Sequence, residues 1–508
     1  MRIVFLAKMA QLISTNADTG AAAAAQAPER KRSLLAALTL GAGIYAAANF
    51  ATRALNFFLL PLYTRFLSPA DYGVISLSEI IATAFIAIAA CGFEPALRRL
   101  YFRYPECSTE QRQYVGSVLR FSLAAIALGV AICFLIAQLG RRQWFSIRFF
   151  PYIALALGTA AASQVTQYCL ALFETRQRPR LYALWVALLF ALTTGCTIWL
   201  VVFARRGAQG MLAGKLLAAA LVALISGVAL WPWLQTQWEW RFVRETWPLA
   251  WPLMPHQIMA LGLVIADRFL LERYRTLGEV GIYSLAYTCG MAMYLGTTSL
   301  LQAWSPMFFD LARQGASARL QLGKLSSALA IGLAALATLG ALLAAPLVRL
   351  LDARYTELAT LIPLVIAGYL FHGFFALLQL PILQAERSRP ILFASAVALA
   401  ANLAFNFLWI PRWGMYGAAY ATIAGYALEA MMMFGFAQRI HPLTYSRPRI
   451  FGMLAVFGAA VAFAEIVPSS RSLSFTAIAL AFALFAIWLV LGKSFPSQVA
   501  KPNEARNG

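Results

Sequence analysis

The feature that most constrains this chain is a series of apolar stretches, each about 20 residues long, that recurs from residue 38 almost to the C-terminus. A helix of roughly this length crosses the hydrocarbon core of a bilayer. Charged residues make up only 12% of the chain and hydrophobic residues 61%, whereas a soluble domain carries about 25% charged residues. Because lipid offers no hydrogen-bond partners to the backbone, each stretch must be helical. The sequence therefore predicts an all-α, polytopic membrane protein.

Fourteen transmembrane helices are predicted. Their ranges are 38–62, 73–96, 114–138, 149–173, 181–204, 208–233, 249–271, 280–303, 326–348, 358–381, 390–411, 414–437, 448–467 and 472–492. An even number of spans puts both termini on one side of the membrane. Lys and Arg are about twice as frequent in the segments on the side of the N-terminus as in those on the opposite side. This excess predicts that both termini are cytoplasmic.

The charge and cysteine patterns exclude several classes of function. The net charge is +21, but the basic residues form short clusters between apolar stretches, which membrane topology explains without nucleic-acid binding. The six cysteines are scattered and form neither a disulfide framework nor a zinc motif. Every connection is short, and no nucleotide-binding, metal-binding or nucleophile motif is present. We expect no enzymatic activity, no cofactor and no nucleic-acid partner.

An internal repeat divides the chain. Residues 71–77 (DYGVISL) correspond to residues 279–285 (EVGIYSL), displaced by 208 positions. Two further pairs follow at nearly the same displacement: residues 207–211 with 414–418, and 176–179 with 387–390. The offset spans six helices, an even number, so the halves share one orientation and are related by an axis along the membrane normal.

The repeat predicts a domain organisation. We expect a basic cytosolic tail (1–37), an N-terminal six-helix lobe (38–234), a C-terminal six-helix lobe (249–437), a terminal helix pair (448–492) and a second cytosolic tail (493–508). Two such lobes around a cavity near the midplane are typical of transporters. A duplicated scaffold without a transport role is the alternative.

Two basic residues lie deep inside predicted spans. Arg53 is midway along the first span, and Lys215 is about eight residues, or about 12 Å, into the sixth. A charge at this depth costs about 2.5–3.5 kcal/mol unless water or a partner stabilises it. Both residues are therefore predicted to bind an anionic substrate in a hydrated cavity. Burial against Glu79, at similar depth in the second span, is the alternative.

Other polar residues in the spans are weaker candidates. Arg268 is expected to bind substrate or to extend toward the membrane surface, while Glu79 and Asp267 are candidates for carrying a coupling ion. The amides of Asn49, Gln164 and Gln167 suit sugar hydroxyls, and they equally suit hydrogen bonds between helices.

The motifs of the chain resemble a known family. Leu67-Ser68-Pro69-Ala70-Asp71-Tyr72-Gly73 after the first span is similar to the signature of polysaccharide-biosynthesis flippases of O-antigen or exopolysaccharide repeat units. Asp267-Arg268-Phe269 and the segment 278–284 resemble the corresponding signature of the second half. This family belongs to the multidrug/oligosaccharidyl-lipid/polysaccharide exporter superfamily.

The resemblance implies a function. Members move an undecaprenyl-pyrophosphate-linked oligosaccharide across the bacterial inner membrane by alternating access, using a cationic cavity, for lipopolysaccharide O-antigen, exopolysaccharide or capsule. The partners that it implies are the lipid-linked glycan, membrane lipid, a polysaccharide polymerase and a chain-length regulator.

Two other functions remain open at this point. A drug or organic-cation antiporter of the same superfamily needs acidic groups for its cargo, and Glu79 and Asp267 are candidates. An integral-membrane glycosyltransferase or ligase needs a substantial external loop, whereas the connections here are short.

Overall fold

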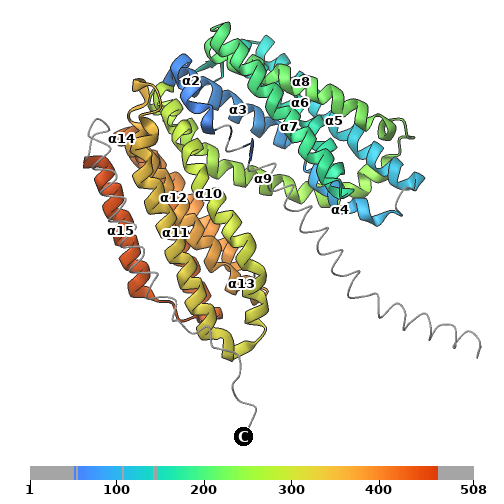
Figure 1. Ribbon diagram of the computed structural model, residues 1–508. Helices are drawn as coiled ribbons and strands as arrows, with labels where there is room; N and C mark the ends of the chain where they lie inside the picture. The colour runs from blue at the N-terminus through green and yellow to red at the C-terminus, as the bar shows by residue number, and fades with distance from the viewer. Residues whose placement is uncertain are drawn as a thin grey trace, which may run out of the picture.

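The computed structural model describes residues 51–466, apart from residues 53–54, 56, 106–107, 141–142, 145 and 388; for residues 252–265, 316–317 and 465–466 it describes the backbone alone. Two of the predicted site residues, Asn49 and Arg53, and the last predicted span, 472–492, lie outside the described residues. Within them the chain forms two groups of long helices (Figure 1), which meet near α2 and α14 and run apart toward α4 and α13.

The first group is the N-terminal lobe. Its helices are α2 (Leu60–Phe66), α3 (Pro69–Ala89), α4 (Phe93–Leu100), α5 (Thr109–Gln138), α6 (Ala154–Thr175), α7 (Pro179–Ile198) and α8 (Gly207–Leu234). Shorter elements are η1 (Tyr101–Arg103), η2 (Phe149–Ile153), η3 (Trp199–Phe203) and an antiparallel hairpin of β1 (Gln143–Trp144) and β2 (Ile147–Arg148). The family-like motif starts α3: Ser68 and Asp71 form a reciprocal capping box around Pro69, which satisfies two otherwise unpaired backbone donors.

The second group is the C-terminal lobe. Its elements are α9 (Trp240–Tyr274), α10 (Leu277–Ala312), η4 (Gly315–Ala318), α11 (Arg319–Val348), η5 (Ala353–Tyr355), α12 (Leu358–Leu378), α13 (Leu380–Gln384), α14 (Arg389–Ile440) and α15 (Arg447–Ile466). Helix α9 links the two groups, because its first half, with Phe242, Val243 and Ala250, packs into the core of the N-terminal lobe. The eleventh and twelfth predicted spans are continuous in α14. The chain reverses between them at Gly414, whose φ of 55° and ψ of −132° are not helical and favour glycine.

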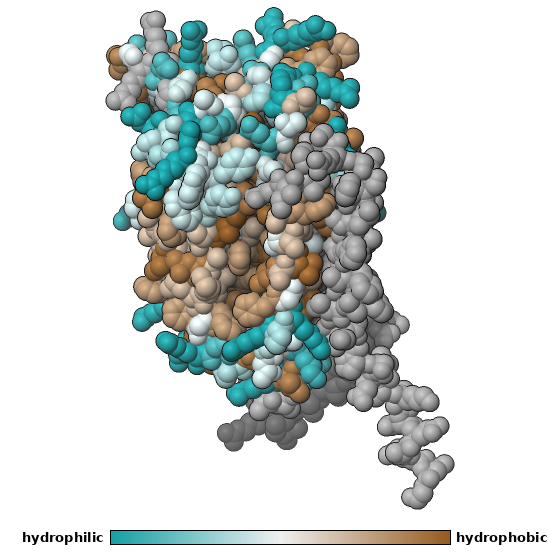
Figure 2. All heavy atoms as spheres, turned by 90° about the vertical axis from the view of Figure 1, so that its left-hand side faces the viewer, coloured by the Kyte–Doolittle hydropathy of each residue, from teal (hydrophilic) through white to brown (hydrophobic). Residues whose placement is uncertain are grey.

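The described helices confirm the predicted fold class. The spans from the second to the thirteenth all coincide with helices, and nine helices in the described part of the chain are long and apolar enough to cross a membrane. Helix α10 is long enough but is rich in Tyr, Thr and Gly. Figure 2 shows a belt of apolar side chains between polar ends on the face that it presents. The protein is a multi-pass, all-α membrane protein.

Helices α3 and α10, which occupy equivalent positions in the repeat, pack against each other at the junction of the lobes. The Ser76 and Ser284 hydroxyls, 208 residues apart, lie 2.7 Å from each other. A Cβ atom on Gly73 would overlap the carbonyl oxygen of Leu277, and one on Gly281 would overlap that of Pro69. These two contacts are also displaced by 208 residues. The two halves of the repeat are therefore related by a pseudo-twofold axis that passes between α3 and α10.

Acidic side chains repeat a second contact in both lobes. The Asp71 carboxylate accepts a hydrogen bond from the backbone N–H of Ala208, at the start of α8 (3.3 Å). The Glu279 carboxylate accepts one from Met415, at the start of the second half of α14 (3.2 Å). An anionic acceptor at a helix N-terminus is favourable because the terminal N–H groups are otherwise unpaired.

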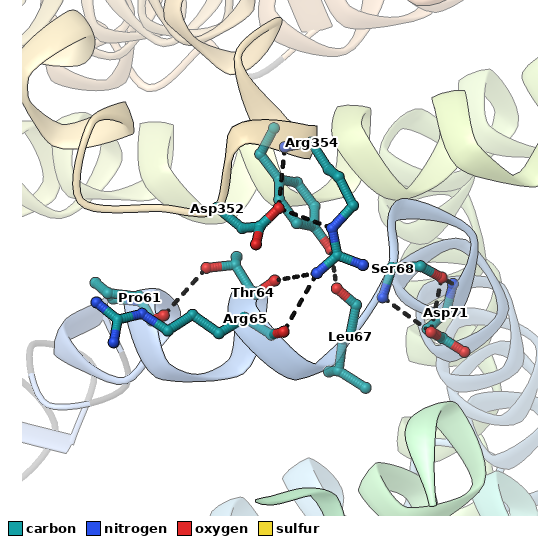
Figure 3. Close-up of polar contacts among 9 residues, drawn as sticks. Pro61, Thr64, Arg65, Leu67, Ser68, Asp71, Asp352 and Arg354 are labelled. Atoms are coloured by element: carbon teal, nitrogen blue, oxygen red, sulfur yellow. Dashed lines mark hydrogen bonds and ion pairs between the residues drawn. The ribbon is translucent and has the colours of Figure 1, made fainter. Parts of the chain in front are cut away.

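We call the end where the lobes meet the closed end; it contains residues 64–71, 146, 272–281 and 352–355. Figure 3 shows Arg354, from the connection between α11 and α12, extending to the C-terminal end of α2. Its Nη2 donates to the carbonyls of Thr64 (3.1 Å) and Arg65 (3.3 Å), and the Tyr355 hydroxyl donates to that of Leu67 (2.8 Å). A hydrogen bond from Arg354 lowers the pKa of Asp352, which keeps this carboxylate ionised beside the guanidinium.

A second contact at the closed end mirrors the first. The Ser146 N–H, in the β1–β2 hairpin of the N-terminal lobe, donates to the Glu272 carboxylate at the end of α9 (2.7 Å). Ser146 and Arg354 are displaced by 208 residues, as are Thr64 and Glu272. Each lobe therefore sends one connection to the first helix of the other lobe.

Candidate functional site

A cavity of about 470 Å³, which we call the central cavity, lies between the lobes. Its walls come from α2, α3, α7 and α8 of the N-terminal lobe and from α9, α10 and α12 of the C-terminal lobe. The polar and charged residues that line it are Tyr63, Tyr72, Ser76, Glu79, Thr83, Thr193, Thr194, Thr197, Lys215, Arg268, Ser284, Tyr287, Thr288 and Tyr369. Two of the predicted basic residues, Lys215 and Arg268, thus face one space from opposite lobes.

Lys215 is both paired and open to the central cavity. Its Nζ lies 2.5 Å from Glu79 Oε1, and the two side chains are 29% and 38% exposed. The pairing joins α8 to α3 and neutralises two charges that would otherwise be costly at this depth. Lys215 therefore lines a cavity and also pairs with Glu79, and its role in binding an anionic substrate stays a prediction.

Arg268 lies in a more enclosed environment than the sequence suggested. It does not extend to the membrane surface: it is 6% exposed and Asp267 is 2% exposed. Its Nη1 lies 3.3 Å from Asp267 Oδ1, and its Nε donates to the Ser284 hydroxyl (3.3 Å). The guanidinium carbon also lies over the Tyr287 ring, 4.6 Å from its centroid, a favourable cation–π arrangement.

Asp267 is a buried counter-charge and does not line the central cavity. Its Oδ2 accepts a hydrogen bond from the Tyr283 hydroxyl (2.5 Å), and its Oδ1 accepts one from the Arg268 backbone N–H (2.8 Å). The carboxylate therefore holds the guanidinium in place from the side away from the central cavity, and its role in ion coupling stays a prediction.

The predicted glutamines lie in a second space, of about 500 Å³, which we call the side cavity. It is formed by α3, α4, α6 and α8, and Gln164 and Gln167 line it together with the hydroxyls of Thr159 and Ser163. Glu79 and Thr83 line both cavities. The side cavity therefore adjoins the central cavity along α3.

Sequence reasoning missed the hydroxyl groups of the central cavity. Thr193 and Thr197 lie one turn apart on α7, so they share a face, and Thr197 Oγ1 lies 2.6 Å from the Tyr63 hydroxyl. Tyr287 and Tyr369 contribute the opposite wall. The threonine spacing was a readable signal, whereas single tyrosines in apolar helices are not distinctive.

Metal and redox centres are not evident in the described residues. No group of three or more His, Cys, Asp or Glu side chains in this part of the chain is placed to hold a metal ion. Its five cysteines are free thiols.

Comparison with solved structures identifies the fold. The lipid II flippase MurJ in an inward closed conformation is similar with a TM-score of 0.68 and 11% sequence identity, over 88% of this chain and 98% of that chain. A multidrug resistance MATE family transporter of the MOP superfamily, inward-facing, gives a TM-score of 0.55 at 13% identity, over 81% and 99% of the two chains. The Vibrio cholerae MATE transporter VcmN gives 0.53 at 17% identity, over 80% and 98%.

Comparison of sequences identifies the family. No curated protein sequence matches this chain. A family profile described as "Polysaccharide biosynthesis protein" matches residues 38–312, more than half of the 508 residues. The match contains Lys215, Arg268, and the carboxylates of Asp71 and Glu279 near the pseudo-twofold axis. The chain belongs to the polysaccharide biosynthesis protein family and shares its fold with the lipid II flippase MurJ and with MATE transporters.

Proposed function

We propose that this protein is a flippase that carries an undecaprenyl-pyrophosphate-linked oligosaccharide across the bacterial inner membrane by alternating access. The product would serve the synthesis of O-antigen, exopolysaccharide or capsule. The observation that supports this most directly is the central cavity, in which Lys215 and Arg268 face one space from opposite lobes. Membership of the polysaccharide biosynthesis family and the fold shared with the lipid II flippase MurJ agree with it.

The pyrophosphate is the part of such a lipid that crosses hydrocarbon least readily, because its charges must leave water. In the proposed mechanism Lys215 releases Glu79 and binds a phosphate oxygen, while Arg268 supplies planar donors on the other side. The hydroxyls of Tyr63, Thr197 and Ser284 donate further hydrogen bonds to the phosphate oxygens. Glu79, freed from its partner, would take up a proton or another cation, which links substrate binding to a coupling ion.

Alternating access requires the closed end to separate while the other end comes together. The predicted topology would place the closed end on the periplasmic side. The state described here would then receive substrate from the cytoplasmic leaflet. The polyprenyl tail would stay in lipid during the cycle, with the terminal helix pair (448–492) as a flank.

Arg53 and Asn49 remain candidates for the same substrate from the first span. In the predicted first span, their i, i+4 spacing would put them on one face. The polymerase and the chain-length regulator that would receive the product stay proposed partners, and both termini are proposed to be cytoplasmic.

An organic-cation antiporter is the competing function. It would need carboxylates that face the cargo without a cation beside them. In the described structure Glu79 is paired with Lys215 and Asp267 with Arg268, so both acidic candidates are neutralised. The basic partners are neutralised equally, but Lys215 and Arg268 both line the central cavity, whereas Glu79 does and Asp267 does not. The lining therefore carries two cations and one carboxylate, which favours an anionic cargo.

Binding in lipid nanodiscs tests the proposal. Full-length protein should bind an undecaprenyl-pyrophosphate-linked disaccharide, and Lys215→Met should weaken binding by about tenfold, the expected loss of one charge-assisted contact. Glu110→Gln, which changes an exposed residue of α5 paired with Arg241, is the matched control. Unchanged affinity in both Lys215→Met and Arg268→Met would contradict the proposed site.

A further inference from the structure

The side cavity differs in charge from the central cavity. Of the fifteen described residues that line it, two are glutamates and none is a lysine, arginine or histidine. Its remaining polar groups are neutral hydroxyls and amides: Thr83, Thr159, Ser163, Gln164 and Gln167. A ligand in this space would therefore meet hydrogen-bonding groups and negative charge.

The cations that pair with these glutamates do not line the side cavity. Arg98 Nε lies 2.5 Å from Glu94 Oε1, and the same guanidinium is also paired with Glu174 of α6. One arginine thus serves two carboxylates, and this group of three carries a net charge of −1. Glu79 is paired with Lys215, which lines the central cavity and not the side cavity.

The two cavities are placed to receive different parts of one substrate. They share Glu79 and Thr83 along α3, so a group bound by Lys215 is adjacent to the Glu79 end of the side cavity. The sugar that is linked directly to a pyrophosphate would lie next to that group. The glutamine amides match sugar hydroxyls because each amide both donates and accepts.

We infer that the side cavity selects the sugars next to the pyrophosphate by charge: it accepts neutral and amino sugars and rejects uronic and other acidic sugars. The inference rests on the proposed function and names its substrate class. A sugar carboxylate here would face Glu94, whose side chain is only 22% exposed. Like charges repel more strongly beside partly buried groups than in bulk water. A sugar ammonium would be attracted to the same carboxylate.

The test uses synthetic lipids that differ in one sugar. Full-length protein in nanodiscs is presented with undecaprenyl-pyrophosphate disaccharides whose second sugar, counted from the pyrophosphate, is glucose, glucuronic acid or glucosamine, and with undecaprenyl pyrophosphate alone. The glucuronic-acid lipid should bind about tenfold more weakly than the glucose lipid because of like-charge repulsion. The glucosamine lipid should bind at least as tightly as the glucose lipid.

Two variants at different positions of the side cavity should change the affinity difference between the glucose and glucuronic-acid lipids. Glu94→Gln should remove most of the tenfold difference, and it leaves Arg98 with Glu174 as a partner. Gln167→Lys, at an exposed position of the cavity wall, should bring the glucuronic-acid lipid to the affinity of the glucose lipid or above. Glu110→Gln, away from both cavities, should preserve the wild-type order.

The outcomes separate this inference from the proposed function. Failure of undecaprenyl pyrophosphate to bind would overturn the proposed function and the inference together. If the protein binds undecaprenyl pyrophosphate but binds the glucose and glucuronic-acid lipids with equal affinity, the inference alone is overturned. A difference that persists in both Glu94→Gln and Gln167→Lys would also overturn it, since the discrimination would then arise elsewhere.

Discussion

At the scale of single residues, the Lys215–Glu79 pair controls how much positive charge the central cavity offers. The 2.5 Å contact means that an anion must compete with Glu79 for the ammonium group. Such competition weakens binding but also lets the substrate leave, since the carboxylate reclaims the lysine after release.

Glu79→Gln should therefore bind the pyrophosphate lipid more tightly and release it more slowly. We expect about fivefold to tenfold tighter binding, because one charge-assisted competitor is removed. Affinity and single-turnover release in nanodiscs measure the two effects. Weaker binding in Glu79→Gln would show that the glutamate contacts substrate favourably.

Asp267 has a different role, because it is almost fully buried behind Arg268. Removing one partner of a buried ion pair leaves an uncompensated charge and costs about 3–5 kcal/mol. Asp267→Asn should lower the thermal unfolding temperature in detergent markedly. Asp310→Asn, at a surface carboxylate whose side chain is 76% exposed, is the control and should change it little; equal effects of the two substitutions would argue against the buried pair.

At the scale of elements, the crossing of α3 and α10 depends on two glycines. Gly73 and Gly281 each leave space for a carbonyl oxygen of the other helix, so Gly73→Ala and Gly281→Ala should each cost about 1–3 kcal/mol by overpacking. Gly227→Ala in α8, where no neighbouring atom lies within 4 Å, should be neutral or slightly stabilising. Unfolding in detergent measures all three, and a stable Gly73→Ala protein would contradict the close crossing.

The two mirrored connections at the closed end are also elements with a testable effect. Arg354 donates to two carbonyls near the end of α2. We expect Arg354→Ala to destabilise the closed state by about 1 kcal/mol, which shifts the equilibrium between closed and open states about fivefold toward open. Spin labels at the exposed positions Arg65 and Thr356 would report a longer distance population in Arg354→Ala.

Glu272→Ala removes the mirrored contact with Ser146 and should add to that shift. Arg313→Ala, at an arginine whose side chain is 78% exposed, is the control. An unchanged distance distribution in the double variant would show that these connections do not hold the closed end.

The sequence predicted some elements and contacts better than others. Apolar length located every helix from the second span to the thirteenth, because lipid leaves the backbone no alternative. The repeat predicted which segments correspond, and Ser76 and Ser284 meet accordingly. The repeat did not predict the Ser146–Glu272 and Arg354–Thr64 contacts, because the connections that make them carry no motif. The two contacts are nevertheless related by the same offset of 208 residues.

At the scale of the whole molecule, the plan of two pseudo-symmetric lobes was predictable and the closed end was not. Alternating states of a transporter differ by only a few kcal/mol, and no residue pattern reports such a difference. Likewise, Lys215 was recognisable as an unusual buried cation, whereas its simultaneous pairing and exposure required the packing of α3 against α8.

The central claim is that the two lobes move a pyrophosphate-linked glycan between leaflets. The direct measurement is translocation in proteoliposomes that contain only this protein and an undecaprenyl-pyrophosphate-linked disaccharide placed in the inner leaflet. An external lectin then detects the sugars that reach the outer leaflet. We predict that the glycan appears in the outer leaflet with wild-type and Glu110→Gln protein, and that its rate of appearance falls about tenfold or more with Lys215→Met. The account would be contradicted if, under an imposed ion gradient and membrane potential, the wild-type protein gave no more external glycan than protein-free vesicles.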